Sequence, residues 1–320
     1  MLTATMLLFG VALILGCGDE SELPEWPVDL SMAAYAEYEA TRLGPEAATA
    51  FLERARRVDL ERMLAQDLIV LGTVSSLGSK ATETGIYTTI HVDVEEVLKG
   101  QCPRSSIEIW KVGGTLHGRR ASVDLNIPAH AGPPGNDPPD VGTRHIFLGR
   151  RVGDNGAVLA GGRQNLRYEV RDGIVVRKGL KLDEFLAVIA RHVERRTPAC
   201  LYRCSDAVVL AEVVEKVFAH RRPIAGRADS NYTLVAAHEV AKGSVEPNQR
   251  LRIALPYAVD VVGDDLPRFG EADRVVLFLS ASGGAWSLNG GWDSVLHVRA
   301  DGSFANYSSL RQLADESAVP

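Results

Sequence analysis

The chain has 320 residues, of which 46% are hydrophobic and 24% are charged, and its formal net charge is −6. A chain of this length is expected to form two domains, each with enough apolar side chains to bury a core of its own. The acidic balance disfavours nucleic acid as a partner, because neutralising phosphates requires a concentrated basic face.

The chain begins with a short apolar run over residues 6–15, followed by Gly16 and Cys17. This run is too short to span a bilayer. Apolar Ile14 and small Gly16 stand where a bacterial lipobox requires them, so we expect residues 1–16 to be a signal peptide and Cys17 to carry the lipid. The alternative is a signal peptide without lipidation. The segment departs from the usual pattern in one respect, because residues 1–5 lack the Lys or Arg that signal peptides carry.

Residues 17–31 are acidic, contain two prolines and are predicted to form a tether. We therefore expect a protein of the cell envelope that is attached to the membrane by its lipid. Because Gly18 rather than Asp follows Cys17, delivery to the outer membrane is expected if the host is Gram-negative.

Residues 32–66 are predicted to be a helical segment, because Ala, Glu, Leu and Arg predominate there. Gly44 and Pro45 divide it, with Pro45 suited to a first helical turn. A second helix is predicted over residues 180–195, where apolar residues recur with helical spacing. Thr197-Pro198 ends it and divides the chain into domains at 67–196 and 197–320. A short closing helix is predicted over residues 308–313.

Five blocks of sequence occur twice, in the same order, which indicates an internal duplication. In the clearest block, Gly161-Gly162 and Asp172-Gly173 recur 129 residues later as Gly290-Gly291 and Asp301-Gly302. The offsets of other blocks drift, as insertions in surface loops would cause. Chance resemblance among β-rich segments is the alternative.

Each copy is predicted to contain five or six short strands, arranged as a small barrel or sandwich. Residues 86–97 are rich in β-branched side chains, and residues 107–112 and 251–255 alternate between apolar and polar. The two Asp-Gly pairs supply the positive φ that tight hairpins require, and the Gly-Gly pairs suit a bulge or sharp bend. The expected fold class is therefore α+β and mainly β: two tandem small β-barrel domains, each followed by a helix, behind an N-terminal helical segment.

The blocks at residues 67–73 with 95–100, and at 206–214 with 239–243, resemble bacterial modules of the netrin-like or tissue-inhibitor-of-metalloproteinase-like type. The resemblance implies OB-type barrels. Inhibitors of that type chelate the target's zinc through an N-terminal Cys-x-Cys. This chain departs from that pattern, because the first copy has no cysteine at its start and the second has Cys200 and Cys204 at the wrong spacing. The resemblance therefore carries over the fold and not the inhibitory segment.

Three cysteines remain besides Cys17, namely Cys102, Cys200 and Cys204. Outside the cytoplasm thiols tend to oxidise, and a Cys200–Cys204 bridge can form if this segment is not a regular strand. Three unoxidised buried thiols are the alternative. The neighbouring residues include no His at a spacing typical of zinc sites, so no metal site is predicted.

The sequence contains no nucleophile elbow, P-loop, dinucleotide fingerprint or His-Glu-x-x-His motif, so no catalytic residue and no cofactor are predicted. His117, His130 and His145 form the densest set of histidines, but none of them recurs in the second copy. The acidic residues Asp260, Asp264 and Asp265 lack the ligand spacing of a calcium loop and are expected to be solvated.

The aromatic residues Trp286, Trp292 and Tyr257 are candidate ligand-binding residues, since exposed rings on barrels can stack on a sugar or a peptide. We expect at least one of the two tryptophans to lie in the core instead. The function expected from the sequence is non-catalytic binding of an envelope protein or other envelope ligand through loops of the two modules. One alternative is an inhibitor or sensor of an envelope enzyme that uses loops 113–140 and 256–270. The other is a hydrolase whose site is assembled from scattered His and Asp.

Overall fold

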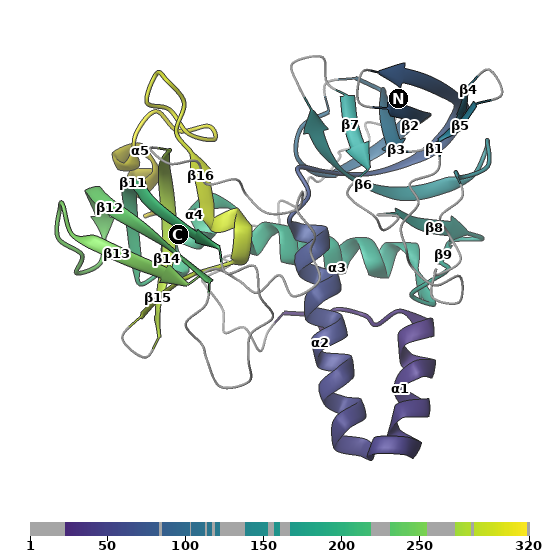
Figure 1. Ribbon diagram of the computed structural model, residues 1–320, viewed down its shortest axis with the longest axis horizontal. Helices are drawn as coiled ribbons and strands as arrows, with labels where there is room; N and C mark the ends of the chain where they lie inside the picture. Colours follow the sequence, from purple (N-terminus) through teal and green to yellow (C-terminus); the bar gives the residue numbers. More distant parts are fainter. Residues whose placement is uncertain are drawn as a thin grey trace, which may run out of the picture.

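A computed structural model describes residues 23–82, 85–102, 104–112, 114–116, 119–121, 138–152, 157–160, 167–218, 231–254, 273–282 and 285–318. The fold is mainly β, with strands arranged in two main sheets (Figure 1). Several predicted features lie outside the described residues. They are the signal peptide, the lipidation site Cys17, most of the tether, and the residues His117, His130, Tyr257, Asp260, Asp264 and Asp265. No helix in the described part of the chain is long and apolar enough to cross a membrane.

Two helices, α1 (Leu30–Leu43) and α2 (Pro45–Leu64), form the N-terminal segment and divide at Gly44, as predicted. Gly44 has φ 93°, a conformation that favours glycine, and its N–H donates to Ala40 O. Pro45 then occupies the first turn of α2, where its missing N–H costs nothing. Figure 1 shows the two helices side by side, as a hairpin that projects below the first sheet.

The first sheet contains a closed five-stranded barrel with the strand order β1-β2-β3-β7-β6, completed by pairing between β6 and β1. The barrel strands are β1 (Leu68–Thr82), β2 (Gly85–Lys99), β3 (Ser106–Val112), β6 (Arg144–Val152) and β7 (Ala157–Ala160). Three short strands extend the sheet beyond β6: β8 (Arg167–Arg171), β9 (Ile174–Val175) and β10 (Leu180–Lys181). A separate hairpin is formed by β4 (Gly114–Leu116) and β5 (Arg119–Ala121).

The second sheet has the order β11-β12-β13-β15-β14-β16, and β11 also pairs with β14. Its strands are β11 (Ala207–Phe218), β12 (Asn231–Lys242), β13 (Arg250–Ala254), β14 (Arg274–Ser282), β15 (Ala285–Leu288) and β16 (Val295–His297). The order of these six strands repeats β1-β2-β3-β7-β6-β8 of the first sheet. Each sheet contains a parallel pair at the same place in its strand order: β3 with β7 in the first sheet and β13 with β15 in the second.

The register of the first strand pair is interrupted at matching places in the two sheets. Shifts between β1 and β2 follow Ile69, Leu71 and Val74, and shifts between β11 and β12 follow Val208, Leu210 and Val213. Each residue of the second set lies 139 positions after its counterpart. Bulges bend a strand and increase its twist, so the two long strands curve at equivalent points.

A Lys-Gly pair stands at the end of β2 and again at the end of β12, and the lysine makes similar contacts in both places. The ammonium of Lys99 donates to Leu64 O at the end of α2, and that of Lys242 donates to Tyr202 O and Arg203 O at the end of the preceding helix. These carbonyls have no partner within their own helices, so each lysine caps a helix C-terminus. The following residues, Gly100 and Gly243, have φ 83° and 92°.

Each sheet has an inner and an outer apolar layer, because alternate side chains of a strand point to opposite faces. In the first barrel Val70 and Val92 belong to the inner layer, whereas Ile69 and Ile146 pack outside against α3 (Leu182–Arg195). In the second sheet, inner Val209 and Val235 are counterparts of Val70 and Val92. The outer layer of the second sheet packs against α4 (Pro198–Cys204) and α5 (Leu310–Ser317).

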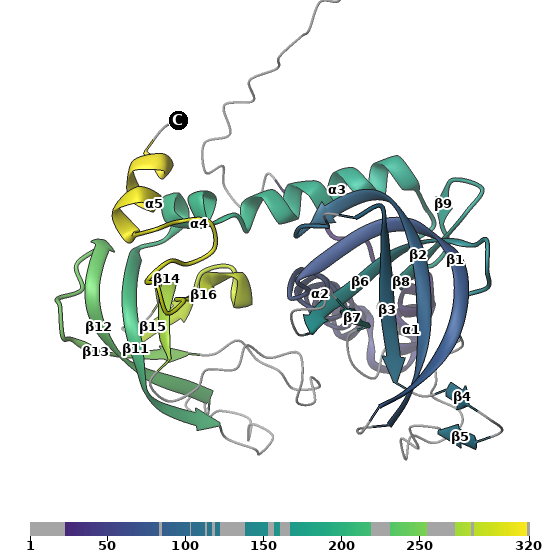
Figure 2. The ribbon, with the colours of Figure 1, turned by 90° about the horizontal axis from the view of Figure 1, so that it is seen from above.

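Helix α3 runs along the first sheet toward the second, and α4 continues in that direction before β11 begins (Figure 2). The sequence placed the end of α3 correctly at Thr197-Pro198 but did not predict α4. Pro198 both ends the first helix and starts the second, with the Thr197 side chain accepting a hydrogen bond from Cys200 N. The closing helix, predicted at 308–313, occupies Leu310–Ser317.

The two Asp-Gly pairs have different conformations. Asp172 and Gly173 have φ 51° and 74° and connect β8 to β9, as predicted for a tight hairpin. Gly302 has φ 86°, but the Asp301 side chain instead accepts hydrogen bonds from the backbone and hydroxyl of Ser303. The second pair therefore forms a side-chain-stabilised turn. The predicted bend at Gly290-Gly291 leads into a 3-10 turn, η2 (Gly291–Ser294).

Candidate functional site

The predicted binding residues lie in different environments. Trp286 lies in β15, is half-buried and packs against the inner layer of the second sheet, so its ring contributes to the core. Trp292 belongs to η2, and its side chain is not among those described. Together with Tyr257, which lies outside the described residues, this leaves no described aromatic platform around Gly290-Gly291.

Both predicted disulfide residues lie in α4, four residues apart, so the condition that this segment is not a strand is met. Cys200 is buried, while Cys204 Sγ lies 3.8 Å from Arg195 Nη1. The predicted Cys200–Cys204 bridge is not formed, because Cys200 is present as a buried thiol. Cys102 is a free, half-buried thiol that donates to Arg104 O at 3.1 Å.

An aromatic ring under a cation marks the outer face of the first barrel. Trp110 of β3 is half-buried, and Lys80 Nζ lies 4.3 Å from the centre of its ring. The ring of Tyr87 is 5.8 Å away, and the indole N–H donates to Glu108. A second Glu108 oxygen lies 3.7 Å from His91 Nε2. This face thus combines aromatic rings, a cation and a carboxylate. Such a set can bind a ligand that has both an apolar surface and polar groups, through the rings and the charges respectively.

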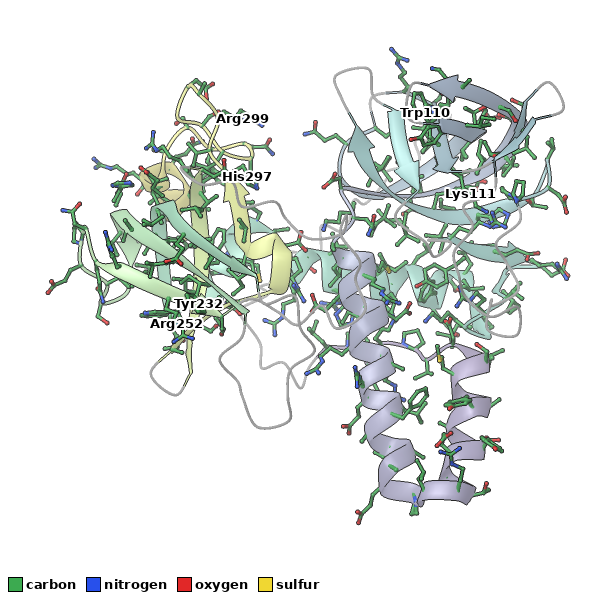
Figure 3. All side chains as sticks on the ribbon, viewed as in Figure 1. Trp110, Lys111, Tyr232, Arg252, His297 and Arg299 are labelled. Carbon is green, nitrogen blue, oxygen red and sulfur yellow. The ribbon has the colours of Figure 1, made fainter. Side chains whose placement is uncertain are left out.

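The second sheet has a pair of the same kind on other strands of its outer face. Arg252 lies over the ring of Tyr232 with 4.0 Å between the guanidinium carbon and the ring centre. In the strand ladders Trp110 stands opposite Thr89, and Tyr232 stands opposite Ala254. The aromatic residue of the first pair is on the third strand and that of the second is on the second strand. Figure 3 shows Trp110 on the first sheet, and Tyr232 and Arg252 next to each other on the second.

The most deeply buried charges form a cluster that joins the N-terminal segment to the first sheet. Lys178, whose side chain is fully buried, lies 2.7 Å from Asp29 Oδ1 and 2.5 Å from Asp59 Oδ2. Asp59 also accepts hydrogen bonds from Trp26 Nε1 and the Tyr168 hydroxyl. Burial, with the nearby Asp59, raises the pKa of Tyr168 well above its usual value. Each charge in this cluster has an opposite partner, so the removal of one partner would leave a buried charge uncompensated.

His145 is the one member of the predicted histidine set that the structure describes. It is 3% exposed on β6, its Nε2 lies 2.8 Å from Thr143 Oγ1, and its ring packs against Phe147. Among the described residues its Nδ1 has no hydrogen-bond partner. Burial lowers the pKa of His145 from 6.5 to about 4, so the ring is neutral at physiological pH. A neutral ring without a hydrogen-bonded carboxylate is a weak candidate for acid–base catalysis.

One ion pair connects the parts of the chain around the two sheets, and a second joins the end of α3 to α2. Lys99 Nζ lies 2.7 Å from Asp293 Oδ1, and Arg196 Nη2 lies 2.7 Å from Glu61 Oε1. Burial raises the pKa of Asp293, while the neighbouring Lys99 opposes that shift. The first pair brings η2 of the second sheet next to β2 of the first.

Within the described ranges, His, Cys, Asp and Glu residues form no group of three or more that could hold a metal ion. The two aromatic–cation pairs were not predicted from the sequence, because Lys80 and Trp110 are far apart along the chain. A comparison with models of known protein families gives no match, and a comparison with curated protein sequences gives none either.

Proposed function

We propose that this chain is a non-catalytic lipoprotein of the cell envelope, built from two tandem OB-like modules that arose by duplication. In this proposal Cys17 carries the lipid, and an envelope protein or another envelope ligand binds to loops and outer faces of the two modules. The modules correspond to residues 67–196 and 197–320.

The duplication is supported by details that a shared fold class does not require. The strand orders agree, the register shifts fall at a constant offset of 139 residues, and a lysine caps the preceding helix in both halves. Leu182 and Phe185 of α3 have counterparts 128 residues later in Leu310 and Leu313 of α5, which pack on the second sheet. Independent origin would have to reproduce each of these features separately.

The single observation that carries the binding proposal is the aromatic–cation pair on the outer face of each sheet. Both pairs lie close to the end of the third strand, at Val112 in the first sheet and Ala254 in the second. The long segments that follow, 113–140 and 256–270, are the least similar parts of the two copies. Variable loops on a common scaffold are where binding functions concentrate.

The alternatives receive less support. An inhibitor or sensor of an envelope enzyme would use the same loops, and it therefore remains the second candidate. The hydrolase needs unpaired or strongly coupled groups in reach of a substrate. The buried charges around Lys178 are instead paired with one another, and His145 is buried and neutral.

The binding proposal is tested with envelope extract from the source organism, by crosslinking to the purified protein and quantitative mass spectrometry. Lys80→Ala combined with Arg252→Ala should reduce recovery of the ligands captured by the wild-type chain. The matched control combines Lys181→Ala and Arg311→Ala, two exposed cations away from both rings. Equal recovery by the two double variants would reject these faces as the binding site.

Two further measurements test the rest of the proposal. Mass spectrometry of the N-terminal peptide should find acylated Cys17 in the wild-type chain and none after Cys17→Ser; an unmodified wild-type cysteine would refute the anchor. Residues 197–320 produced alone should melt cooperatively if they form an independent module. A broad melt without a sigmoidal transition would count against that organisation.

A further inference from the structure

Exposed apolar side chains are concentrated on α1. Of the eleven large hydrophobic residues that are exposed in the described part of the chain, five lie on this 14-residue helix. Four of them, which we call the α1 patch, are Met32, Tyr35, Tyr38 and Leu43, with exposed fractions between 42% and 59%. At 3.6 residues per turn these four fall within roughly 140° of the helix circumference. Soluble surfaces rarely group such side chains without a partner.

The α1 patch is held on a fixed support. Helix α1 packs against α2, its buried residues are Ala36 and Glu39, and the ring of Tyr35 lies 5.2 Å from that of Phe51. At its base, Leu30 N donates to Arg177 O at 2.8 Å, and Asp29 forms an ion pair with Arg177. The helix is therefore attached to the first sheet at one end, while Figure 1 shows the rest of the hairpin projecting away from both sheets.

The position of the α1 patch in the chain identifies its partner. Leu23, the first described residue, is six residues after Cys17, and six residues extend to about 20 Å at most. The neighbouring Trp26 packs on Phe185 and His192 of α3, so this part of the chain is fixed to the body of the protein. A lipid on Cys17 would therefore keep the hairpin close to the membrane surface.

The composition of the α1 patch also fits the boundary between lipid headgroups and acyl chains. Tyrosine combines an apolar ring with a polar tip and is enriched at this level of the bilayer, where Met and Leu can enter the apolar layer. Arg42 is exposed on the same helix, beside Tyr35, where its cation can pair with lipid phosphate. We propose that the α1 patch rests on the phospholipid bilayer as a second point of attachment, which orients the two sheets relative to the membrane. This inference rests on the proposed lipid anchor at Cys17.

The test uses the mature polypeptide from Gly18 onward, which contains every described residue and lacks the lipid. It is mixed with vesicles of phosphatidylethanolamine and phosphatidylglycerol and floated on a density gradient. The wild-type polypeptide should float with the vesicles, and Tyr35→Ser with Tyr38→Ser should lower its partition coefficient roughly tenfold. The matched control is Leu77→Ser with Val141→Ser, which removes two exposed apolar side chains from the first barrel. Circular dichroism should show equal melting of all three polypeptides.

Either absence of flotation or equal flotation of the two double variants would overturn the proposal. Light scattering tests whether the α1 patch binds a second copy of the chain instead of the bilayer. Dimerisation of the wild-type polypeptide but not of the tyrosine variant, with no flotation of either, would show that it does. The polypeptide in this experiment lacks Cys17, so a negative flotation result does not bear on acylation of Cys17. Mass spectrometry of the full-length protein tests that acylation separately.

Discussion

Lys99 Nζ contacts two partners at once: the carbonyl oxygen of Leu64 at the end of α2 and, at 2.7 Å, the carboxylate of Asp293 in η2. The side chains of Lys99 and Asp293 are only 16% and 20% exposed. Its counterpart Lys242 caps α4 through Tyr202 and Arg203. One lysine therefore retains the capping role of the repeated motif and also links the two sheets.

Replacing Lys99 should consequently cost more stability than replacing Lys242. We expect Lys99→Met to lower the free energy of unfolding by about 2–3 kcal/mol, because it leaves the buried Asp293 carboxylate without its cation. Lys242→Met, which removes only a cap, should cost about 1 kcal/mol. Urea denaturation of both variants measures the difference. A double-mutant cycle with Asp293→Asn isolates the ion pair, and a coupling near zero would show that Lys99 acts only as a cap.

The buried cluster around Lys178 makes a stronger prediction. Lys178→Met should destabilise the protein by about 3–5 kcal/mol, because it removes the buried cation that pairs with both Asp59 and Asp29, of which Asp29 retains its ion pair with Arg177. Thermal and urea unfolding of the variant measure this loss. Lys181→Met is the matched control, since Lys181 is exposed three residues away. Similar stability of the two variants would show that the cluster is solvated rather than buried.

The repeated glycines should be intolerant of a side chain for two reasons. At Gly100 and Gly243 a Cβ atom would approach the carbonyl oxygens of Asp67 and Asp206 more closely than the 3.0 Å that real Cβ atoms keep. Gly142 and Gly302 also have positive φ, but a Cβ there would meet nothing within 4 Å. We expect alanine to cost about 1 kcal/mol at the latter pair and at least about twice that at the former. Equal losses at all four positions would mean that φ alone matters.

His145 should make the stability of the first barrel depend on pH. Its pKa is about 4 in the folded chain and near 6.5 when unfolded, so the unfolded state binds a proton more readily. Above pH 6.5 the residue has no effect on the pH dependence. As pH falls from about 6.5 to about 4, stability is lost. His145→Phe should reduce the difference in unfolding free energy between pH 7.5 and pH 5, and an unchanged difference would assign the effect to other groups.

The local elements could be predicted from the sequence, because their signals lie within a few residues. Gly44 and Pro45 mark a helix boundary through φ and a missing N–H, and Asp172-Gly173 specifies a tight hairpin. The duplication gave the correspondence of the strands. Helix α4 was missed because Pro198 serves as both a stop and a start signal, and its seven residues are too few to show a period.

The contacts that define the candidate sites could not be predicted in the same way. Lys178 meets Asp59 across 119 residues, and Lys99 meets Asp293 across 194. Nothing in the local sequence of either lysine indicates such a partner, because only the folded chain brings them together. Trp286 shows the opposite difficulty: its sequence context suits either a platform or a core position, and its packing in the fold makes it part of the core.

In the described part of the chain, β3 and β7 face each other through two residue pairs, and so do β13 and β15. By contrast, β1 and β11 pair with β2 and β12 over most of their length, and with β6 and β14 over six residues each. Thermal fluctuations should therefore separate this short seam long before the whole protein unfolds, and amide protons along it should exchange with deuterium early. Trp110 and Ala254 belong to this seam, so the proposed ligand would bind where each sheet opens most easily.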